Sequence, residues 1–197
     1  MQICKNQDLT PDLTPFSTVG PFFKLLVRDR PEGTDRLVTD ATRGERITIA
    51  GTLIAGGGAP VEDGLVEIWQ ADADGHYHHP GDPARDLADP AFTGFGRAAT
   101  GRGGAFRFLT VRPGVVPGPA EQKQAPHILV SVMARGVMSR CWTRLYFEDE
   151  PLNASDPILQ LVPAPRRDTL IARRRDAGEY EFNIVLQGER ETVFFEA

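Results

Sequence analysis

The residues best suited to metal chemistry lie in one short segment, where His76, His78 and His79 surround Tyr77. Imidazole nitrogens are ligands for zinc, copper and iron, and carboxylates can add oxygen ligands. Acidic side chains lie nearby, at positions 72, 74 and 82. In an extended chain, His76 and His78 lie on the same face, so a mononuclear metal site is one hypothesis. The alternative, which the pattern alone favours, is a polar exposed loop with only adventitious affinity for metals.

Tyr77 and His127 each have two interpretations. A tyrosinate is a hard anionic ligand that suits ferric iron, and it would act together with a second tyrosine and with histidines. The simpler interpretation of Tyr77 is a tyrosine packed in a loop, with its hydroxyl at the surface. His127 stands at the start of an apolar run, where a single histidine is more often structural than a ligand.

Nucleophilic catalysis finds little support in the sequence. There is no Gly-x-Ser-x-Gly nucleophile elbow. Cys4 lies in an irregular terminus and Cys141 lies in a strand pattern, where a buried, inert thiol is expected. Two cysteines make neither a disulfide framework nor a four-thiolate zinc site, which favours reduced thiols and a cytoplasmic protein. The glycine-rich segment 101–104 precedes a strand pattern and therefore predicts a turn, not a phosphate-binding loop.

The composition is that of a globular protein. The chain has 197 residues and a net charge of −5, with 41% hydrophobic and 25% charged residues, which argues against disorder of the whole chain. No apolar run approaches the length of a membrane span, and we expect no secretory signal. The acidic balance argues weakly against a nucleic-acid partner. We expect one domain over residues 1–197, since domains typically have ~100–200 residues.

The elements that must position these side chains are predicted to be strands. Alternating or apolar runs separated by Gly and Pro predict strands at 47–54, 65–70, 105–111, 127–134, 141–147 and 180–186, with a hairpin turn around Gly136. The best helix candidate is short, at 168–175, with Asp168 as a possible N-cap. We therefore expect an all-β fold, a β-sandwich of mixed or antiparallel strands with long loops and little helix.

Three segments lack a clear strand pattern. Residues 1–45 are predicted to form an extended N-terminal arm that packs on a surface, because Phe16, Phe22 and Phe23 are too apolar for a solvated tail. The sandwich core is then 46–197. Residues 71–104 and 113–126 are predicted to be long loops, and such loops are usually functional or disordered. All four histidines lie in these two loops or just after them.

Motifs along nearly the whole chain resemble those of the intradiol ring-cleaving dioxygenases. The N-terminal segment 14–22 is similar to a signature of that family, and residues 65–77 resemble its strand leading to the first iron-ligating tyrosine. Segments 95–97, 110–114, 125–128, 143–147 and 187–195 follow in the family's order. The resemblance implies a β-sandwich, in agreement with the strand pattern.

Active members of that family hold non-haem ferric iron with two tyrosines and two histidines, the histidines spaced as His-x-His. By resemblance, Tyr77 occupies the first tyrosine position and His127 the first histidine position. Val116 stands at the second tyrosine position and Leu129 at the second histidine position. Neither aliphatic side chain offers a donor atom. The resemblance therefore implies a vestigial site that holds no metal, and a chain that is inactive alone.

The resemblance further implies a non-catalytic, alpha-type subunit of a hetero-oligomer, whose beta-type partner chain carries the ferric iron. The assembled enzyme would use O2 to open the ring of protocatechuate between its adjacent hydroxyls, giving 3-carboxy-cis,cis-muconate in the β-ketoadipate pathway. This chain would border the partner's cleft, and the matching positions are Thr18, Gly20, Pro21, Phe22 and Arg135. Phe22 stands where the family often has a tyrosine, which removes a hydroxyl contact.

Two other functions stay open at the level of sequence. One is a self-sufficient mononuclear metalloenzyme that uses the His76–His79 loop. The other is a β-sandwich scaffold module with no role in the chemistry. Metal analysis of the isolated chain distinguishes the first of these from the dioxygenase subunit, and the activity of the partner chain alone distinguishes the second.

Overall fold

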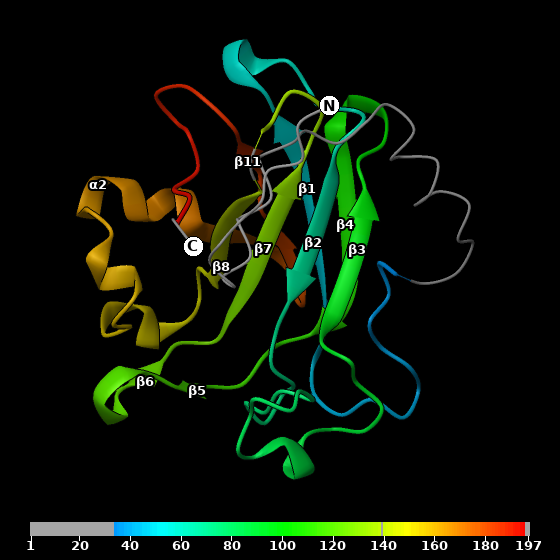
Figure 1. Ribbon diagram of the computed structural model, residues 1–197, viewed down its shortest axis with the longest axis vertical. Helices are drawn as coiled ribbons and strands as arrows, with labels where there is room; N and C mark the ends of the chain where they lie inside the picture. The colour runs from blue at the N-terminus through cyan, green and yellow to red at the C-terminus, as the bar shows by residue number, and fades with distance from the viewer. Residues whose placement is uncertain (1–33, 139, 196–197) are drawn as a thin grey trace, which may run out of the picture.

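The computed structural model describes residues 34–138 and 140–195, and strands dominate this part of the chain (Figure 1). The strands are β1 (Arg46–Ile54), β2 (Leu65–Trp69), β3 (Phe95–Ala99), β4 (Ala105–Val111), β5 (Val116–Pro117), β6 (Lys123–Gln124), β7 (His127–Met133), β8 (Cys141–Phe147), β9 (Ile171–Asp176), β10 (Glu179–Glu181) and β11 (Ile184–Val185). The single α-helix among the described residues is α2 (Ala164–Arg167). Short 3₁₀ segments lie at Gly56–Gly58, Arg85–Leu87, Arg102–Gly104, Pro119–Glu121, Pro151–Ala154, Leu159–Leu161 and Asp168–Leu170.

The strands form two layers joined through β9. Hydrogen bonds connect them in the order β11-β1-β10-β9-β8-β7-β2-β3, and β4 pairs with β1 outside this path. One layer contains β3, β2, β7 and β8, which are antiparallel to their neighbours. The other contains β4, β1 and β10, with β1 and β10 parallel. The predicted strand-rich sandwich of mixed and antiparallel strands is therefore confirmed.

The hydrophobic core lies between the two layers. One layer contributes Ile47, Ile49 and Phe108, and the other contributes Ile68 and Ile128, all at most 2% exposed. These side chains alternate along their strands with residues that face away, as period-two alternation requires. The opposite face of the β3-β2-β7-β8 layer is consequently free to carry polar and aromatic side chains.

The segment before β1 packs on this core where it is described. Leu37 and Val38 are buried in the main hydrophobic cluster, and the backbone N–H of Leu37 donates to the carbonyl of Leu109. Thr34 also accepts a hydrogen bond from the backbone N–H of Arg97 in β3. The course predicted for the rest of the arm lies outside the described residues.

The predicted helix at 168–175 is wrong. Residues Ile171–Asp176 form β9, and only Ala164–Arg167, just upstream, are α-helical. The start of β9 pairs in parallel with Tyr146 and Phe147 of β8, and Ala172 is fully buried there. Pairing with the sheet outweighs the helix propensity of a short Ala- and Arg-containing run, because propensity is a weak prior.

The structure also differs from the prediction in the two long loops and in the last strand. The segment 71–104 was expected to be a loop throughout, but it contains β3, whose small side chains Gly96, Ala98 and Ala99 give a weak strand signal. The short pair β5-β6 lies within the predicted loop 113–126. The strand predicted at 180–186 is split into β10 and β11, and Asn183 between them accepts a hydrogen bond from the backbone N–H of Thr52.

Within the described ranges, no helix is long and apolar enough to cross a membrane.

Candidate functional site: a pocket at one end of the sheet

Strand pairing places three side chains in one row on the outer face of the β3-β2-β7-β8 layer. Trp69 of β2 pairs with Leu129 of β7, and Leu129 pairs with Arg144 of β8. His127 lies two residues before Leu129, so it shares their face, and it pairs with Tyr146. The sheet itself therefore brings an indole, a guanidinium and an imidazole to one end of this face.

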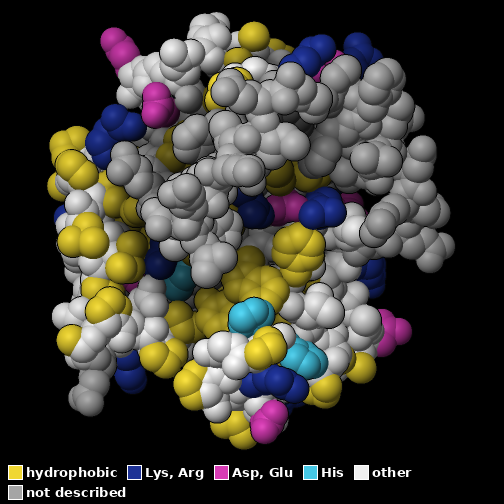
Figure 2. All heavy atoms as spheres, viewed as in Figure 1, with side chains coloured by type: hydrophobic (Ala, Val, Ile, Leu, Met, Phe, Trp, Pro, Cys, Tyr) yellow, Lys and Arg dark blue, Asp and Glu magenta, His cyan; other side chains and the backbone are white. Residues whose placement is uncertain are grey.

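A pocket of about 410 Å³ opens at this end. Its lining includes all four positions that the family resemblance singles out, namely Tyr77, Val116, His127 and Leu129. The remaining lining residues are Trp69, Gly75, His79, Gly81, Asp82, Pro83, Pro117, Gln124 and Arg144. In the space-filling view, hydrophobic side chains gather in the middle of the face and histidines lie next to them (Figure 2). The four positions, which are far apart in the sequence, thus converge on one cavity.

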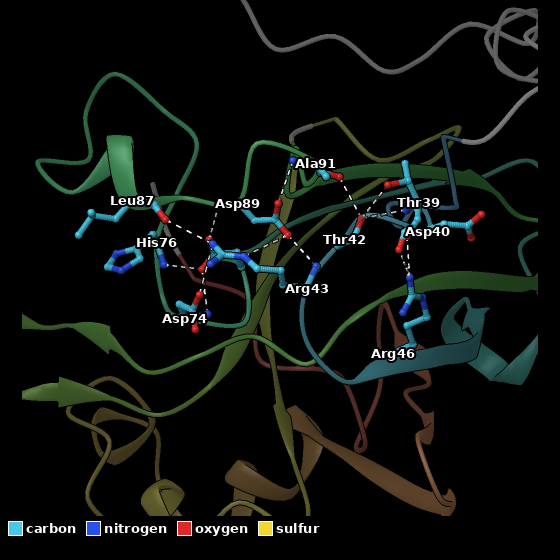
Figure 3. Close-up of polar contacts among 11 residues, drawn as sticks. Thr39, Asp40, Thr42, Arg43, Arg46, Asp74, His76, Leu87, Asp89 and Ala91 are labelled. Atoms are coloured by element: carbon cyan, nitrogen blue, oxygen red, sulfur yellow. Dashed lines mark hydrogen bonds and ion pairs between the residues drawn. The ribbon is translucent and has the colours of Figure 1, made fainter.

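Backbone hydrogen bonds to buried carboxylates fix the loop that carries Tyr77. Asp72, which is 3% exposed, accepts from the backbone N–H groups of Asp74, His76 and Asp89 at 2.7–2.9 Å. Asp89 in turn accepts from the backbone N–H of Arg43 at 2.7 Å (Figure 3). Carboxylates that accept several N–H bonds give an irregular loop the partners that a regular element would supply.

A close backbone contact brings the two loops of the pocket together. Gly75 has φ of +88°, and a Cβ atom at this position would lie 2.1 Å from the carbonyl oxygen of Val115. The backbone N–H of Gly114 also donates to the carbonyl of Asp72 at 2.8 Å. Only glycine combines the left-handed conformation with such an approach. Gly75 thereby holds together the loops that carry Tyr77 and Val116, which both line the pocket.

His127 is held as a metal-ligating histidine commonly is. Its ring is 4% exposed, and Nδ1 lies 2.7 Å from the carbonyl oxygen of Ala125. A carbonyl can only accept, so Nδ1 carries the proton and Nε2 keeps a free electron pair. Burial, together with the charge of Arg144, lowers the pKa of His127 from 6.5 to about 4. The ring is therefore neutral near pH 7.

A buried carboxylate supports the peptide that orients His127. Asp156, which is fully buried, accepts from the backbone N–H of Ala125 at 2.8 Å and from the Tyr146 hydroxyl at 3.0 Å. Burial and the neighbouring Asp156 raise the pKa of Tyr146, so this phenol stays protonated and donates. The Tyr146 ring lies 5.7 Å from the imidazole of His127. Asp156 thus positions His127 through Ala125 and Tyr146.

Tyr77 is packed against aromatic neighbours. Its ring stacks on Trp69 with centroids 5.9 Å apart and an interplanar angle of 15°. His79 meets the same indole edge-on at 6.0 Å. Burial raises the pKa of the Tyr77 hydroxyl, although the charge of Arg144 partly opposes the effect. The phenol is therefore neutral near pH 7 rather than a tyrosinate.

Arg144 brings a positive charge to the pocket wall. Its Nη1 donates to Oε1 of Gln124 at 2.7 Å and lies 3.4 Å from the Tyr146 hydroxyl. Among the described residues, no carboxylate lies within ion-pairing distance of this half-buried guanidinium. The charge of Arg144 disfavours both protonation of His127 and the binding of a cation here.

The donor set of the pocket does not fit the four-ligand iron centre of the active members of the family that the sequence resembles. Val116, 5% exposed, and Leu129 present only carbon atoms to the cavity. Of the four positions that the resemblance singles out, Tyr77 and His127 carry a donor atom, and two donors are fewer than the three or four protein ligands of a typical metal site. Among the described residues, no three His, Cys, Asp or Glu side chains lie close enough together to share a metal ion.

The structure does not gather the histidine loop into a site of its own. Tyr77 and His79 line the pocket, as does Gly75, but His76 and His78 do not. The backbone N–H of His76 donates to Asp72 at 2.9 Å, and its side chain is half-buried. The structure therefore does not bring His76 and His78 together at the cavity.

The residues predicted to border the partner's cleft are Arg135, which lies away from this pocket, and four arm residues outside the described ranges. Arg135 follows β7 in the turn to β8, eight residues beyond His127, and at about 3.3 Å per residue the two are at opposite ends of the strand (Figure 1). Its side chain is 66% exposed and pairs with Asp63 at 2.9 Å. Thr18, Gly20, Pro21 and Phe22 fall outside the described residues.

Some pocket residues were not identified as candidates from the sequence. Trp69, Gln124 and Arg144 line the cavity, yet each falls in or next to a strand pattern with no feature that suggests chemistry. The alternation of side chains between the two faces of a strand could have indicated Trp69 and Arg144. Positions 127 and 129 share a face, and any residue that pairs with them across the sheet shares it too.

The fold and the pocket together define a class: a β-sandwich protein whose pocket, at one end of the sheet, is lined by aromatic rings, an imidazole and a guanidinium. A family model described as Dioxygenase matches residues 19–188. The chain belongs to this family, the intradiol dioxygenases, and the resemblance seen in the sequence is confirmed.

Curated relatives of the chain include both kinds of subunit of one enzyme. The chain is 40% identical to the protocatechuate 3,4-dioxygenase alpha chain of Pseudomonas putida, over 96% of this chain and 98% of that one. It is 39% identical to the alpha chain of Burkholderia cepacia, over 93% and 96%. The beta chain from Burkholderia cepacia is 43% identical, but over 76% of this chain and 67% of its own.

Among solved structures, the dioxygenase domain of a dioxygenase–carbohydrate-binding fusion from Streptomyces sp. SirexAA-E superposes with a TM-score of 0.60. The two are 29% identical, and the match covers 92% of this chain and 100% of that one.

Proposed function

We propose that this chain is the non-catalytic alpha-type subunit of a protocatechuate 3,4-dioxygenase, assembled with a beta-type chain that holds the ferric iron. The observation that carries the proposal is the pocket itself, which keeps Tyr77 and His127 but has Val116 and Leu129 at the other two donor positions. Near-full-length identity of about 40% to two alpha chains supports the same conclusion.

The assembled enzyme adds both atoms of O2 to protocatechuate. The carbon–carbon bond between the two hydroxylated ring carbons breaks, and each of these carbons becomes a carboxylate carbon of 3-carboxy-cis,cis-muconate. We place this chemistry in the β-ketoadipate pathway and in the cytoplasm. No step of it is assigned to the pocket of this chain, because that pocket lacks the donors for iron.

This chain acts on the reaction by bordering the partner's cleft. Arg135 is suited to this role because its guanidinium is 66% exposed, at the end of the sheet opposite the vestigial pocket. Protocatechuate carries a carboxylate that survives the reaction, and a guanidinium attracts or clamps a carboxylate. The arm residues Thr18, Gly20, Pro21 and Phe22 are proposed to line the same cleft.

The test is to express the full-length chain with and without a beta-type chain and to measure iron and ring cleavage. We expect the pair to consume O2 with protocatechuate and to hold one iron per pair, while this chain alone is colourless. Stoichiometric iron in this chain alone, with a visible absorption band that Tyr77→Phe removes, contradicts the proposal. Full activity of the beta-type chain without this chain would support the scaffold alternative instead.

A further inference from the structure

We infer that the vestigial pocket is a binding site for a small aromatic monocarboxylate, in which Arg144 holds the carboxylate and His127 accepts a hydrogen bond from a ring hydroxyl. The inference rests on the pocket's geometry and goes beyond the proposed function, since it assigns a second ligand site to the assembly.

The charge of the pocket selects an anion. Arg144 has no carboxylate partner among the described residues, and its bond to Gln124 uses a neutral acceptor. Asp82 is the acidic residue in the lining, but its oxygens are already engaged by the backbone N–H groups of Tyr77 at 2.7 Å and Ala84 at 2.8 Å. A single carboxylate pairs with the one charge of Arg144, whereas a dianion such as phosphate is repelled more strongly by Asp82.

The walls select a flat apolar body. Trp69 and Tyr77 present stacked rings, and Val116 and Leu129 present aliphatic carbon where the family has donors. Pockets of about 300–1,000 Å³ with apolar and aromatic walls and a few polar groups are typical of small-molecule sites. The volume of about 410 Å³ accommodates one benzene ring with its substituents.

The polar end of the pocket selects a hydroxyl donor. The Nδ1–H of His127 donates to the carbonyl oxygen of Ala125 at 2.7 Å, which leaves Nε2 facing the pocket side of the ring without this bond. Nε2 is therefore an acceptor, and among the described residues no donor reaches it. A phenolic hydroxyl across the ring from the carboxylate supplies that donor, so 4-hydroxybenzoate is the simplest probe of this class.

The test measures binding of radiolabelled 4-hydroxybenzoate to the full-length chain, purified with its partner where the two co-purify, by equilibrium dialysis. We expect Arg144→Met to weaken one binding site per copy of this chain at least tenfold, because a charge-assisted hydrogen bond is lost. Arg107→Met serves as the control. Arg107 carries an exposed guanidinium on the other layer, outside this pocket, and its loss should leave every site unchanged.

A change of ligand tests the same contact without altering the protein. Crystals of the wild-type protein soaked with 4-hydroxybenzoate should show it between Arg144 and His127, and soaking with its uncharged methyl ester should leave this pocket empty. The inference is overturned if the pocket holds the ester as well as the acid, if it holds neither, or if Arg144→Met loses less than tenfold in affinity. Ring cleavage plays no part in these readouts, so they stand or fail independently of the proposed function.

Discussion

The buried neutral state of His127 should make the stability of this chain fall in mild acid. In the unfolded chain, the imidazole has its ordinary pKa of 6.5, and in the fold that pKa is about 4. Between these two values the unfolded state binds more protons than the folded state, so the free energy of unfolding decreases as pH falls. The decrease begins near pH 6.5 and stops below about pH 4. At 1.36 kcal/mol per pKa unit, the full effect is about 3 kcal/mol, and about 2 kcal/mol has been lost at pH 5.

The assay is urea-induced unfolding of the full-length chain at pH 7.5 and pH 5, followed by tryptophan fluorescence. His127→Gln removes the titrating group, and we expect the variant to lose about 2 kcal/mol less than the wild type over this interval. His78→Gln is the matched control, because the side chain of His78 is exposed and lies outside the pocket. Equal losses in the wild type and His127→Gln, or an NMR titration of His127 with its midpoint above pH 6, would refute the reasoning.

Three further predictions concern the cleft, the missing donors and the support of His127. Arg135→Ala in the assembled enzyme should raise KM for protocatechuate up to about fivefold with kcat nearly unchanged, since exposed ion pairs contribute ~0–1 kcal/mol; steady-state kinetics with uncharged catechol should show no such rise, and an equal rise would make Arg135 structural. Val116→Tyr with Leu129→His should give a chain that binds ferric iron with a visible tyrosinate band, whereas either single variant should not; a colourless double variant would mean that the four positions do not converge as described. Asp156→Asn should cost about 3–5 kcal/mol of unfolding free energy, as expected when one partner of a buried charged network is removed; a loss under 1 kcal/mol in urea unfolding would show that Asp156 does not hold this region.

The strands of the sandwich were predictable from sequence because each long strand has one face in the core. In β1 and β4 the buried side chains recur at every second position, as at Ile47 and Ile49 or at Phe106 and Phe108. Where an element is short or depends on a neighbour, the local signal failed. Strand β9 forms because its first residues pair with Tyr146 and Phe147 of β8. The residue types within 168–175 do not indicate this pairing.

The candidate site was predictable only in part, for a related reason. The resemblance to the dioxygenase family gave Tyr77, Val116, His127 and Leu129 as equivalent positions, and the structure places all of them on one pocket. Arg144 escaped notice because its role depends on lying directly across the sheet from Leu129. Strand register is set by contacts between distant segments, so a local pattern cannot supply it.

Of the four positions that the resemblance singles out, His127 and Tyr77 make contacts that support the fold. His127 satisfies the carbonyl of Ala125 and packs against Tyr146, and Tyr77 stacks on Trp69; replacing either would leave an unfilled space or an unpaired polar group. Without a metal, a tyrosine hydroxyl at position 116 or an imidazole at position 129 would have no such structural contact. Aliphatic side chains at these positions avoid leaving polar groups unpaired against an apolar wall. The contacts of His127 and Tyr77 within this chain therefore help to shape the pocket. What remains is a cavity with a neutral imidazole, a guanidinium and aromatic walls, which suits an organic anion better than a metal ion.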